Sequence, residues 1–149
     1  MNALGILGIH HVAVAVRDLA QARSLYVDLL GLADRGSEPV PSQKVRVLFA
    51  GAGGSEVECL EPLGPDSTVA RFLERRGPGL HHLAYRVADL EAALAELKRR
   101  GTRLIDGAPR PGARGTRVAF LHPSATAGVL TELVEDPPPP TGAAPQETG

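Results

Sequence analysis

The chain has 149 residues, of which 43% are hydrophobic, 22% are charged and 3% are aromatic, and its formal net charge is −1. This length and hydrophobic content fit one compact domain or two small halves that share a core. The near-neutral charge gives no electrostatic reason to expect nucleic acid or an anionic membrane surface as a partner. The few aromatic side chains also argue against base stacking.

Cysteine content and the two ends of the chain suggest a location. The single cysteine, Cys59, cannot form an intramolecular disulfide, and the N-terminal MNALGILGIHH lacks the basic region of a secretion signal. No apolar run approaches the roughly 20 residues that span a bilayer, so we expect a cytoplasmic protein. Residues 136–149, DPPPPTGAAPQETG, are rich in proline and lack apolar periodicity, which predicts a disordered tail.

The first predicted elements occur twice. Residues 8–30, GIHHVAVAVRDLAQARSLYVDLL, are typical of a strand followed by a helix, and residues 79–97, GLHHLAYRVADLEAALAEL, repeat the pattern. A shift of 71 residues lays residues 10–22 over residues 81–93, with seven identities in thirteen ungapped positions. This self-similarity indicates an internal duplication.

Each copy then continues in the same order. Asp18 and Asp89 are the predicted N-caps of the two helices, and Gly31 and Gly101 lie where a C-cap glycine is expected. After each helix come short β-type runs separated by glycine-rich loops, at residues 44–50 and 55–62 in the first copy and 116–123 and 128–135 in the second. These runs account for two of the strands after each helix, and the order that we predict for each copy is βαβββ.

These elements predict one α+β domain over residues 7–135. It consists of module one (7–63), a linking helix (66–77) and module two (79–135). Each small sheet is covered by its own helix on one face, which leaves the other face in need of a partner. We therefore expect the two tandem βαβββ modules to pair their sheets around a shared cleft that binds a metal, as argued next.

Strand alternation places one histidine of each copy on a matching face. His11 shares its face with Ala13 and Ala15, and His82 shares its face with Ala84, while bulkier apolar residues on the opposite faces suit helix packing. A lone strand histidine is more often a core or surface residue than a ligand. However, folding does not require a histidine at the same point of both copies, whereas a site on a pseudo-two-fold axis requires matched ligands.

The last strands of the two copies carry matched carboxylates. Glu58 and Glu132 lie within apolar runs, so both would repel each other and lose solvation unless a cation compensates them. His10 and His81 are repeated as well, but alternation predicts that they face a helix or an edge and are structural. Two imidazoles and two carboxylates suit a divalent metal with open positions for a substrate. The four predicted ligands are His11, Glu58, His82 and Glu132.

The duplicated pattern, with His near the start and Glu near the end of each module, resembles the vicinal oxygen chelate superfamily. More narrowly, PLGPDSTVARFL, GLHHLAYRV, FLHP and GVLTELVE resemble the methylmalonyl-CoA epimerase family, and the similarity covers about residues 7–135. The resemblance implies a homodimer that interconverts the R and S epimers of an acyl-CoA by α-proton abstraction and reprotonation through a metal-stabilised enolate. It implies the same four ligands, with cobalt favoured and manganese, magnesium, nickel or zinc as alternatives.

The resemblance also implies that Glu132 acts in acid/base catalysis. Some family members carry a second catalytic Glu on the strand before the first-module ligand, and our alignment places Arg46 there, which cannot act as a general base. A water or a neighbour such as Glu56 would then carry the second proton. From the residues themselves, Gly112 and Gly115 in PRPGARGTRV, residues 109–118, predict a mobile or tightly turning loop over the cleft. Candidate partners for the coenzyme A phosphates are Arg86, Arg110, Arg114 and Arg117.

Three other functions share this architecture. A ring-cleaving dioxygenase would use two His and one Glu, so a fourth ligand, Glu58, argues against it. A glyoxalase would transfer a proton at a metal on a glutathione adduct. A non-enzymatic small-molecule binding protein need not hold a metal, and the intact His and Glu set argues against it.

Overall fold

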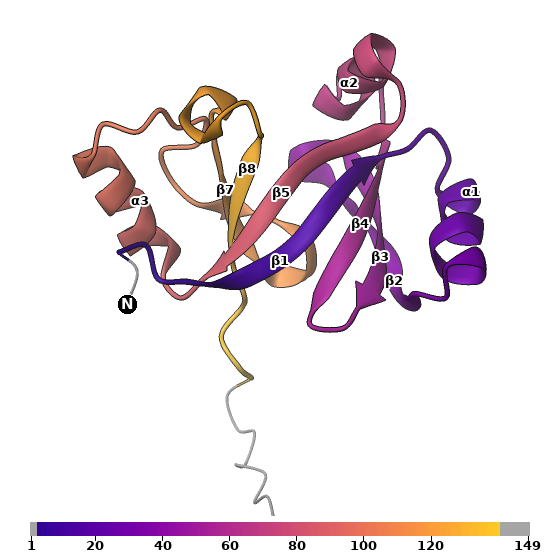
Figure 1. Ribbon diagram of the computed structural model, residues 1–149, viewed down its shortest axis with the longest axis horizontal. Coiled ribbons are helices and arrows are strands. Elements are labelled where there is room, and N and C mark those ends of the chain that lie inside the picture. Colours follow the sequence, from indigo (N-terminus) through magenta and orange to yellow (C-terminus); the bar gives the residue numbers. More distant parts are fainter. Residues whose placement is uncertain (1–2, 141–149) are drawn as a thin grey trace, which may run out of the picture.

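The computed structural model describes residues 3–140, and within them eight strands form one mixed sheet, which confirms the α+β class (Figure 1). The strands are β1 (Ile6–Ala15), β2 (Ala33–Val40), β3 (Val45–Ala52), β4 (Ser55–Pro62), β5 (Gly79–Val87), β6 (Arg110–Pro111), β7 (Arg117–Leu121) and β8 (Thr131–Glu135). The helices are α1 (Leu19–Arg23), continued by a π-helical segment η1 (Ser24–Leu29), α2 (Thr68–Arg76) and α3 (Leu90–Arg99). Short 3-10 turns are η2 (Pro41–Gln43), η3 (Ala113–Gly115) and η4 (Pro123–Thr126).

The two modules join edge to edge. The strand order is β2-β3-β4-β1-β5-β8-β7-β6, with β1 antiparallel to β5 at the junction. On either side of the junction, β1 pairs in parallel with β4 and β5 pairs in parallel with β8. Figure 1 shows β1 and β5 side by side in the middle of the molecule, with α1 and α3 at opposite ends. The predicted pairing of the two modules is thus made by backbone hydrogen bonds between their first strands.

The helix caps follow the sequence signals. The Asp18 carboxylate accepts backbone hydrogen bonds from the first turn of α1, and the Asp89 carboxylate does the same for α3. Ser67 caps α2 through its hydroxyl oxygen. Gly31 and Gly101 adopt φ values of +77° and +70°, which favour glycine after a helix end. The local chemistry predicted for both helix-containing units is therefore confirmed.

Each module has its own apolar core. In module one, Val69 and Leu73 of α2 pack against the inward side chains of β3, while Leu48 of the same strand faces α1 on the other side of the sheet. In module two, the cluster is built on Leu90 and Leu94 of α3 together with β7 and β8. None of the helices within residues 3–140 is long and apolar enough to cross a membrane.

The sequence patterns predicted neither the strands β2 and β6 nor the contact that holds the first residue of the tail. β2, with the sequence ADRGSEPV, is an edge strand that is mostly exposed, so it lacks the apolar alternation that marks a buried strand. Its counterpart β6 has only two residues. The predicted tail begins at Asp136, whose carboxylate lies 2.7 Å from Nε of Arg86, so its first residue is held against the domain. Residues 137–140 are exposed and belong to no helix or strand, and the rest of that prediction, residues 141–149, lies outside the described part of the chain.

Candidate metal-binding active site

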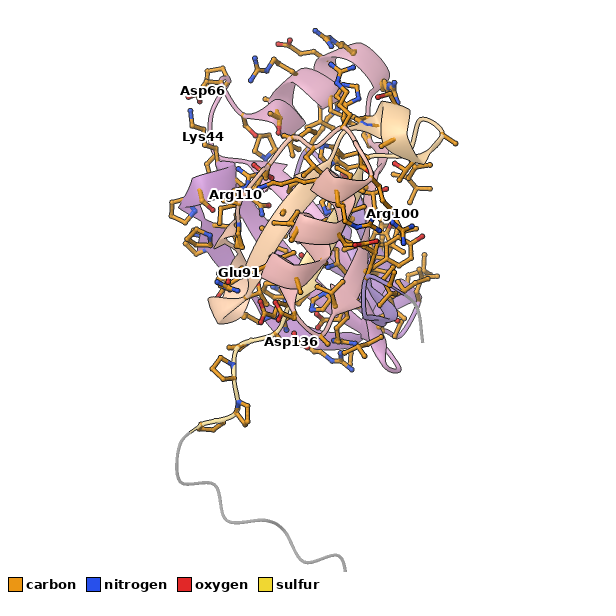
Figure 2. All side chains as sticks on the ribbon, turned by 90° about the vertical axis from the view of Figure 1, so that its left-hand side faces the viewer. Lys44, Asp66, Glu91, Arg100, Arg110 and Asp136 are labelled. Carbon is orange, nitrogen blue, oxygen red and sulfur yellow. The ribbon has the colours of Figure 1, made fainter. Side chains whose placement is uncertain are left out.

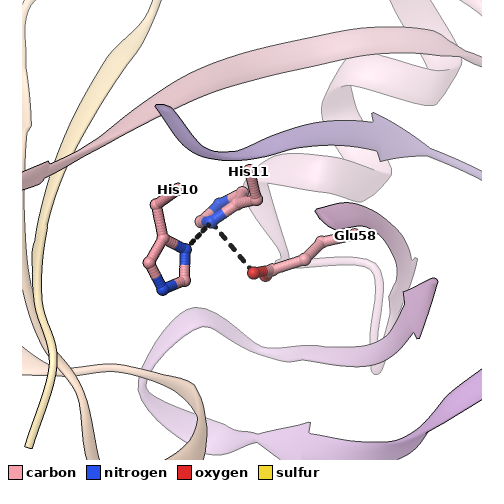
Figure 3. A group of neighbouring side chains, drawn as sticks. All are labelled: His10, His11 and Glu58. Atoms are coloured by element: carbon pink, nitrogen blue, oxygen red, sulfur yellow. Dashed lines mark hydrogen bonds and ion pairs between the residues drawn. The ribbon is translucent and has the colours of Figure 1, made fainter. Parts of the chain in front are cut away.

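Two β-bulges position the paired histidines. The register between β1 and β5 skips His10 in one strand and His81 in the other. Because a bulge interrupts the alternation of side chains, the prediction that His10 faces a helix or an edge is wrong. His10 is 5% exposed, and its Nδ1 lies 2.7 Å from Nδ1 of His11 (Figure 3). His81 does pack against a helix, with its ring centroid 5.1 Å from that of Phe72 in α2.

The structure brings the four predicted ligands together at the junction of the modules. They lie on the adjacent strands β4, β1, β5 and β8, and each is at most 6% exposed. Nδ1 of His11 lies 2.9 Å from Oε2 of Glu58, and Nε2 of His11 lies 3.2 Å from Nε2 of His82. The Glu132 carboxylate lies 3.4 Å from Nε2 of His11 and 3.7 Å from Nε2 of His82. The duplication therefore converges on one buried cluster.

The cluster divides into two overlapping groups that share His11. In one group, ligand atoms of His11, His82 and Glu132 lie within 4.8 Å of one another; in the other, those of His10, His11 and Glu58 do. Figure 3 shows the second group, with His10 and Glu58 both at Nδ1 of His11. A carboxylate at the far nitrogen of a ligating histidine fixes the ring orientation and raises its basicity. In this arrangement Glu58 orients His11, and its role as a direct ligand stays a prediction.

Burial and mutual contacts shift the titration of this cluster. Burial, with the nearby His11 and His81, holds the pKa of His82 well below its usual range, so His82 is a neutral imidazole with a free lone pair. Burial raises the pKa of Glu132 to about 8, against the effect of His11. Burial also opposes protonation of His11, but the carboxylates of Glu58 and Glu132 outweigh it and raise the pKa of His11. The carboxylates thus favour positive charge at the centre of the cluster.

A small cavity, the central cavity, lies at this cluster. Its volume of about 20 Å³ has room for a single water molecule or ion. It is lined by the four predicted ligands together with His10, Val40, Gln43, Val47, Ala113, Arg114, Thr116, Val118 and Val134. Size, burial and the imidazole and carboxylate donors therefore fit one divalent cation.

A loop of module two borders the central cavity through residues 113, 114 and 116, in agreement with the loop predicted over the cleft at residues 109–118. Arg114, at φ +53°, donates hydrogen bonds to the buried carboxylate of Glu56 in module one and places its guanidinium 3.8 Å from the centroid of the Phe49 ring. Its backbone N–H donates to Oε1 of Glu38 at 2.6 Å. Arg114 and Arg35 together outweigh the effect of burial and lower the pKa of Glu56. Glu56 is thus held as a carboxylate that anchors the loop.

The position assigned to Arg46 needs a correction. Arg46 is exposed, and alternation along β3 turns it away from the central cavity. The β3 residue that lines the cavity is its neighbour Val47, and the other inward residues of the strand, Val45 and Phe49, are apolar as well. The conclusion that β3 supplies no general base is unchanged, but the residue responsible is Val47.

The four arginines predicted to meet phosphates have different surroundings. Arg86 pairs with Asp136, Arg114 pairs with Glu56, and Arg117 pairs with Glu91 and Glu135. Arg110 lines a separate cavity beside His82, with its guanidinium 5.3 Å from the centroid of Phe120. Arg110 is also paired, with its Nε 3.4 Å from a carboxylate oxygen of Asp106, and it is the member of the four that lines the cavity beside His82.

Comparison with known proteins places this arrangement in a family. The family model for the glyoxalase/bleomycin resistance protein/dioxygenase superfamily matches residues 10–120. The chain is 40% identical to the mitochondrial methylmalonyl-CoA epimerase of Bos taurus over 126 residues, which cover 84% of this chain and 72% of that protein. The chain belongs to this superfamily and, within it, to the methylmalonyl-CoA epimerase family. It is also 46% identical over 125 residues to the uncharacterized protein YqjC of Bacillus subtilis, covering 84% and 89% of the two chains.

Solved structures agree with this family membership. The methylmalonyl-CoA epimerase of Mycobacterium tuberculosis superposes with a TM-score of 0.88 at 36% identity, covering 93% of both chains. A methylmalonyl-CoA epimerase in complex with methylmalonyl-CoA and an ammonium ion superposes with a TM-score of 0.84 at 34% identity, covering 88% of this chain and 95% of that one. The fold predicted from the duplication is therefore that of the epimerase family.

Proposed function

We propose that this protein is a metal-dependent methylmalonyl-CoA epimerase that interconverts the R and S epimers of its substrate. The observation that carries the proposal is the buried group of His11, His82 and Glu132 at the junction of the two modules, in a chain of the epimerase family. The solved epimerase in complex with methylmalonyl-CoA supports an acyl-CoA substrate.

A divalent metal ion is part of this proposal. His11 and His82 would each offer Nε2, Glu132 would offer a carboxylate oxygen, and Glu58 would either hold Nδ1 of His11 or serve as the fourth ligand. Cobalt is favoured by the family resemblance, and manganese, magnesium, nickel and zinc fit the same nitrogen and oxygen donors. When bound, such an ion supplies positive charge next to the substrate oxygens on which negative charge develops.

Glu132 is the proposed general base. The proton between the thioester and the carboxylate of the substrate is weakly acidic, and a base whose pKa lies near the working pH removes it most effectively. In the metal-free chain burial raises the pKa of Glu132 to about 8, and a cation beside it would favour the ionised carboxylate, which is the form that accepts a proton. Its position beside both cleft histidines would let it reach one face of the α-carbon.

Inversion also requires a proton on the opposite face of the α-carbon. The inward side chains of β3 are Val45, Val47 and Phe49, none of which carries a transferable proton. A water molecule or Glu56 of β4 therefore remains as the proposed second carrier. Glu56 has a lowered pKa because it is bound by Arg114 and Arg35, so it would have to take a proton before it could deliver one.

The exposed face of the junction supports a homodimer. Ile9 and Leu80 on β1 and β5 are 45% and 73% exposed, and Leu7 is 64% exposed. No helix lies over these two strands between α1 and α3 in Figure 1. Burial of such aliphatic side chains against a second copy is favourable. Light scattering of Leu80→Asp against the unaltered protein tests this proposal, which predicts that the variant is monomeric. We also propose a cytoplasmic location, in keeping with one buried, free cysteine.

Turnover of a single epimer tests the function directly. Metal-supplemented protein is incubated with one epimer of methylmalonyl-CoA, and an auxiliary mutase that consumes only the other epimer reports conversion. We expect conversion that stops on addition of a chelator and returns with metal. Inactivity with methylmalonyl-CoA, together with turnover of a glutathione thiohemiacetal or oxygen uptake with a catechol, would assign the site to a glyoxalase or a dioxygenase instead.

A further inference from the structure

A larger hollow lies next to the central cavity. Its volume is about 260 Å³, and we call it the tail-side hollow because Asp136 and Pro137 line it where the chain leaves the domain. The central cavity, of about 20 Å³, shares three lining residues with it, namely His10, Arg114 and Thr116. These three residues therefore form the wall between a cavity with room for one water molecule and a hollow with room for several.

The tail-side hollow and the cavity beside His82 adjoin the central cavity from two directions. The latter cavity, of about 340 Å³, shares Gln43 and His82 with the central cavity. Figure 2 shows Asp136 at the lower end of the domain, whereas Lys44 and Asp66, which line the cavity beside His82, are near the top. A substrate that reaches the cluster from one direction thus requires the other direction to be closed if water is to be excluded.

The side chain of Arg114 holds the wall together across the two modules. Its guanidinium donates hydrogen bonds to both carboxylate oxygens of Glu56 in β4, and it lies 3.8 Å from the centroid of the Phe49 ring in β3. The Arg114 side chain is 37% exposed, whereas that of Glu56 is 7% exposed. Hydrogen bonds from a planar guanidinium to a buried carboxylate are strong and directional. The position of this loop therefore depends on contacts with module one.

The backbone of the loop depends on the same contacts. The hydroxyl of Ser42 donates to the carbonyl oxygen of Pro111 at 2.9 Å, and the backbone N–H of Arg114 donates to Oε1 of Glu38 at 2.6 Å. Arg114 also has a φ of +53°, in the left-handed region that costs free energy for a residue other than glycine. Loss of the side-chain contacts leaves this cost less well offset, so the loop is expected to open.

We propose that Arg114 is a gate residue that, paired with Glu56, closes the central cavity against the tail-side hollow and keeps bulk water from the reacting carbon. The inference rests on the proposed function, because it assumes that a proton is removed from an α-carbon at the cluster. Exclusion of water strengthens electrostatic interactions in a site and prevents the removed proton from exchanging with solvent. Arg114 acts here through the position of the loop, so it is a positioning residue.

Hydrogen exchange of the metal-supplemented protein without substrate tests the closure independently of turnover. Mass spectrometry follows peptides that cover residues 109–118 in the unaltered protein, in Arg114→Ala and in Arg114→Lys. Loss of a charge-assisted contact commonly costs a factor of about ten. We therefore expect the loop of R114A to exchange at least about tenfold faster through local opening, with R114K in between. Circular dichroism verifies the fold, and R114K keeps the charge and tests the gate even if R114A does not fold.

A matched control is available at the same carboxylate. Nη1 of Arg35 lies 3.3 Å from Oε2 of Glu56, and Arg35 lines the tail-side hollow but is not one of the three residues of the shared wall. Arg35→Ala removes the same charge from Glu56 and leaves Arg114 in place, so its loop is expected to exchange as in the unaltered protein. Equal acceleration in R35A and R114A would reduce the effect to the charge around Glu56 and overturn the gate.

Deuterium transfer during turnover connects the closure to the reaction. One epimer of methylmalonyl-CoA is partly converted in deuterated water, and the deuterium content of the recovered starting epimer is divided by the extent of conversion. We expect this ratio to rise severalfold in R114A, because removed protons exchange with the admitted water before they return, and to stay unchanged in R35A.

The two measurements separate the gate from the proposed function. Unchanged loop exchange in both Arg114 variants would overturn the gate. A raised KM with an unchanged deuterium ratio in R114A would make Arg114 a substrate contact and would also overturn it. Faster loop exchange in R114A, in a protein that does not epimerise methylmalonyl-CoA, would keep the closure and overturn the proposed function.

Discussion

The two modules place equivalent residues in the same positions but give them different properties. His11 and His82 occupy matching points of β1 and β5, yet carboxylates raise the pKa of His11, whereas burial lowers that of His82. Glu58 meets only the Nδ1 side of His11, while Glu132 lies near Nε2 of both histidines. Duplication therefore fixes where the ligands lie, and the surroundings of each copy decide what they do.

The bulges show the same division between shared geometry and separate surroundings. Each module repeats an extra histidine at the junction, His10 in one and His81 in the other. His10 is buried, lines the central cavity and lies 3.4 Å from the carboxylate of Asp136. His81 instead lines a cavity of about 340 Å³ beside α2, and burial lowers its pKa to about 4. The repeated His-His dipeptide thus lines two different cavities, one on each side of the cluster.

The largest expected difference between the modules concerns proton transfer. Glu132→Gln should fold and lose epimerisation by about 10²–10⁴-fold, because the amide cannot accept the α-proton. Glu135→Gln, on the same strand but paired with Arg117, is the control and should keep its rate. Initial rates of epimer conversion measure both variants. Turnover by E132Q at the unaltered rate would remove Glu132 from the mechanism.

Loss of the matched histidines should empty the site of metal. H11A/H82A removes both Nε2 ligands, so the metal content after purification should fall from about one ion per chain to below about a tenth. Mass spectrometry of the acid-digested protein gives this number. His122→Ala, at the turn after β7 and hydrogen-bonded to Ser124, should leave metal content unchanged. Undiminished metal in the double variant would contradict the proposed ligands.

Glu58 should matter less than Glu132 if it orients His11 rather than transferring protons. We expect Glu58→Gln to weaken metal binding by about 10–100-fold, a typical cost for a residue that supports a ligand. Excess metal should then restore epimerisation in E58Q, whereas it should not restore E132Q. Titration of activity against metal concentration distinguishes the two variants. An E58Q protein that stays inactive at saturating metal would make the two glutamates equivalent.

Stability of the metal-free protein should reveal the burial of Glu132. Its pKa of about 8 in the folded chain exceeds the ordinary value of 4.5, so between these pH values the unfolded state loses its proton first. The free energy of unfolding contributed by this group therefore falls as pH rises from 4.5 to 8. Glutamine does not titrate. The free energy of unfolding of E132Q should therefore rise relative to that of the unaltered protein between pH 5 and pH 8, by on the order of a few kcal/mol. Urea unfolding after chelation measures the gain, and parallel pH profiles would contradict it.

Periodicity and duplication were sufficient for much of the fold and for the location of the site. The repeat aligned His11 with His82 and Glu58 with Glu132, and the structure brings all four together. Local chemistry also identified the caps Asp18 and Asp89, because a carboxylate just before an amphipathic run accepts hydrogen bonds from the free N–H groups of the first helical turn. That His11, Glu58, His82 and Glu132 bind a metal remains a prediction.

The remaining errors have physical causes in the backbone. Strict alternation misplaced His10, because a bulge depends on how two strands pair and leaves no local mark beyond the doubled histidine. The sequence alignment placed Arg46 where the structure has Val47. A shift of one residue along a strand moves the side chain to the opposite face of the sheet. The strand β2 is polar and lies at the sheet edge, so its pairing is set by β3 rather than by its own pattern. Module two also reaches module one through Arg114 and Glu56, a contact between residues far apart in sequence.

Proton exchange is the most direct measurement of the claim that the two modules form one metal-dependent epimerisation site. Metal-loaded protein is incubated with a single epimer of methylmalonyl-CoA in deuterated water, and deuterium at the α-carbon is followed together with epimer conversion. The proposed chemistry predicts that deuterium enters as the epimers interconvert, and that chelation or E132Q abolishes both signals. A metal-loaded protein that shows neither deuterium incorporation nor conversion would contradict the claim.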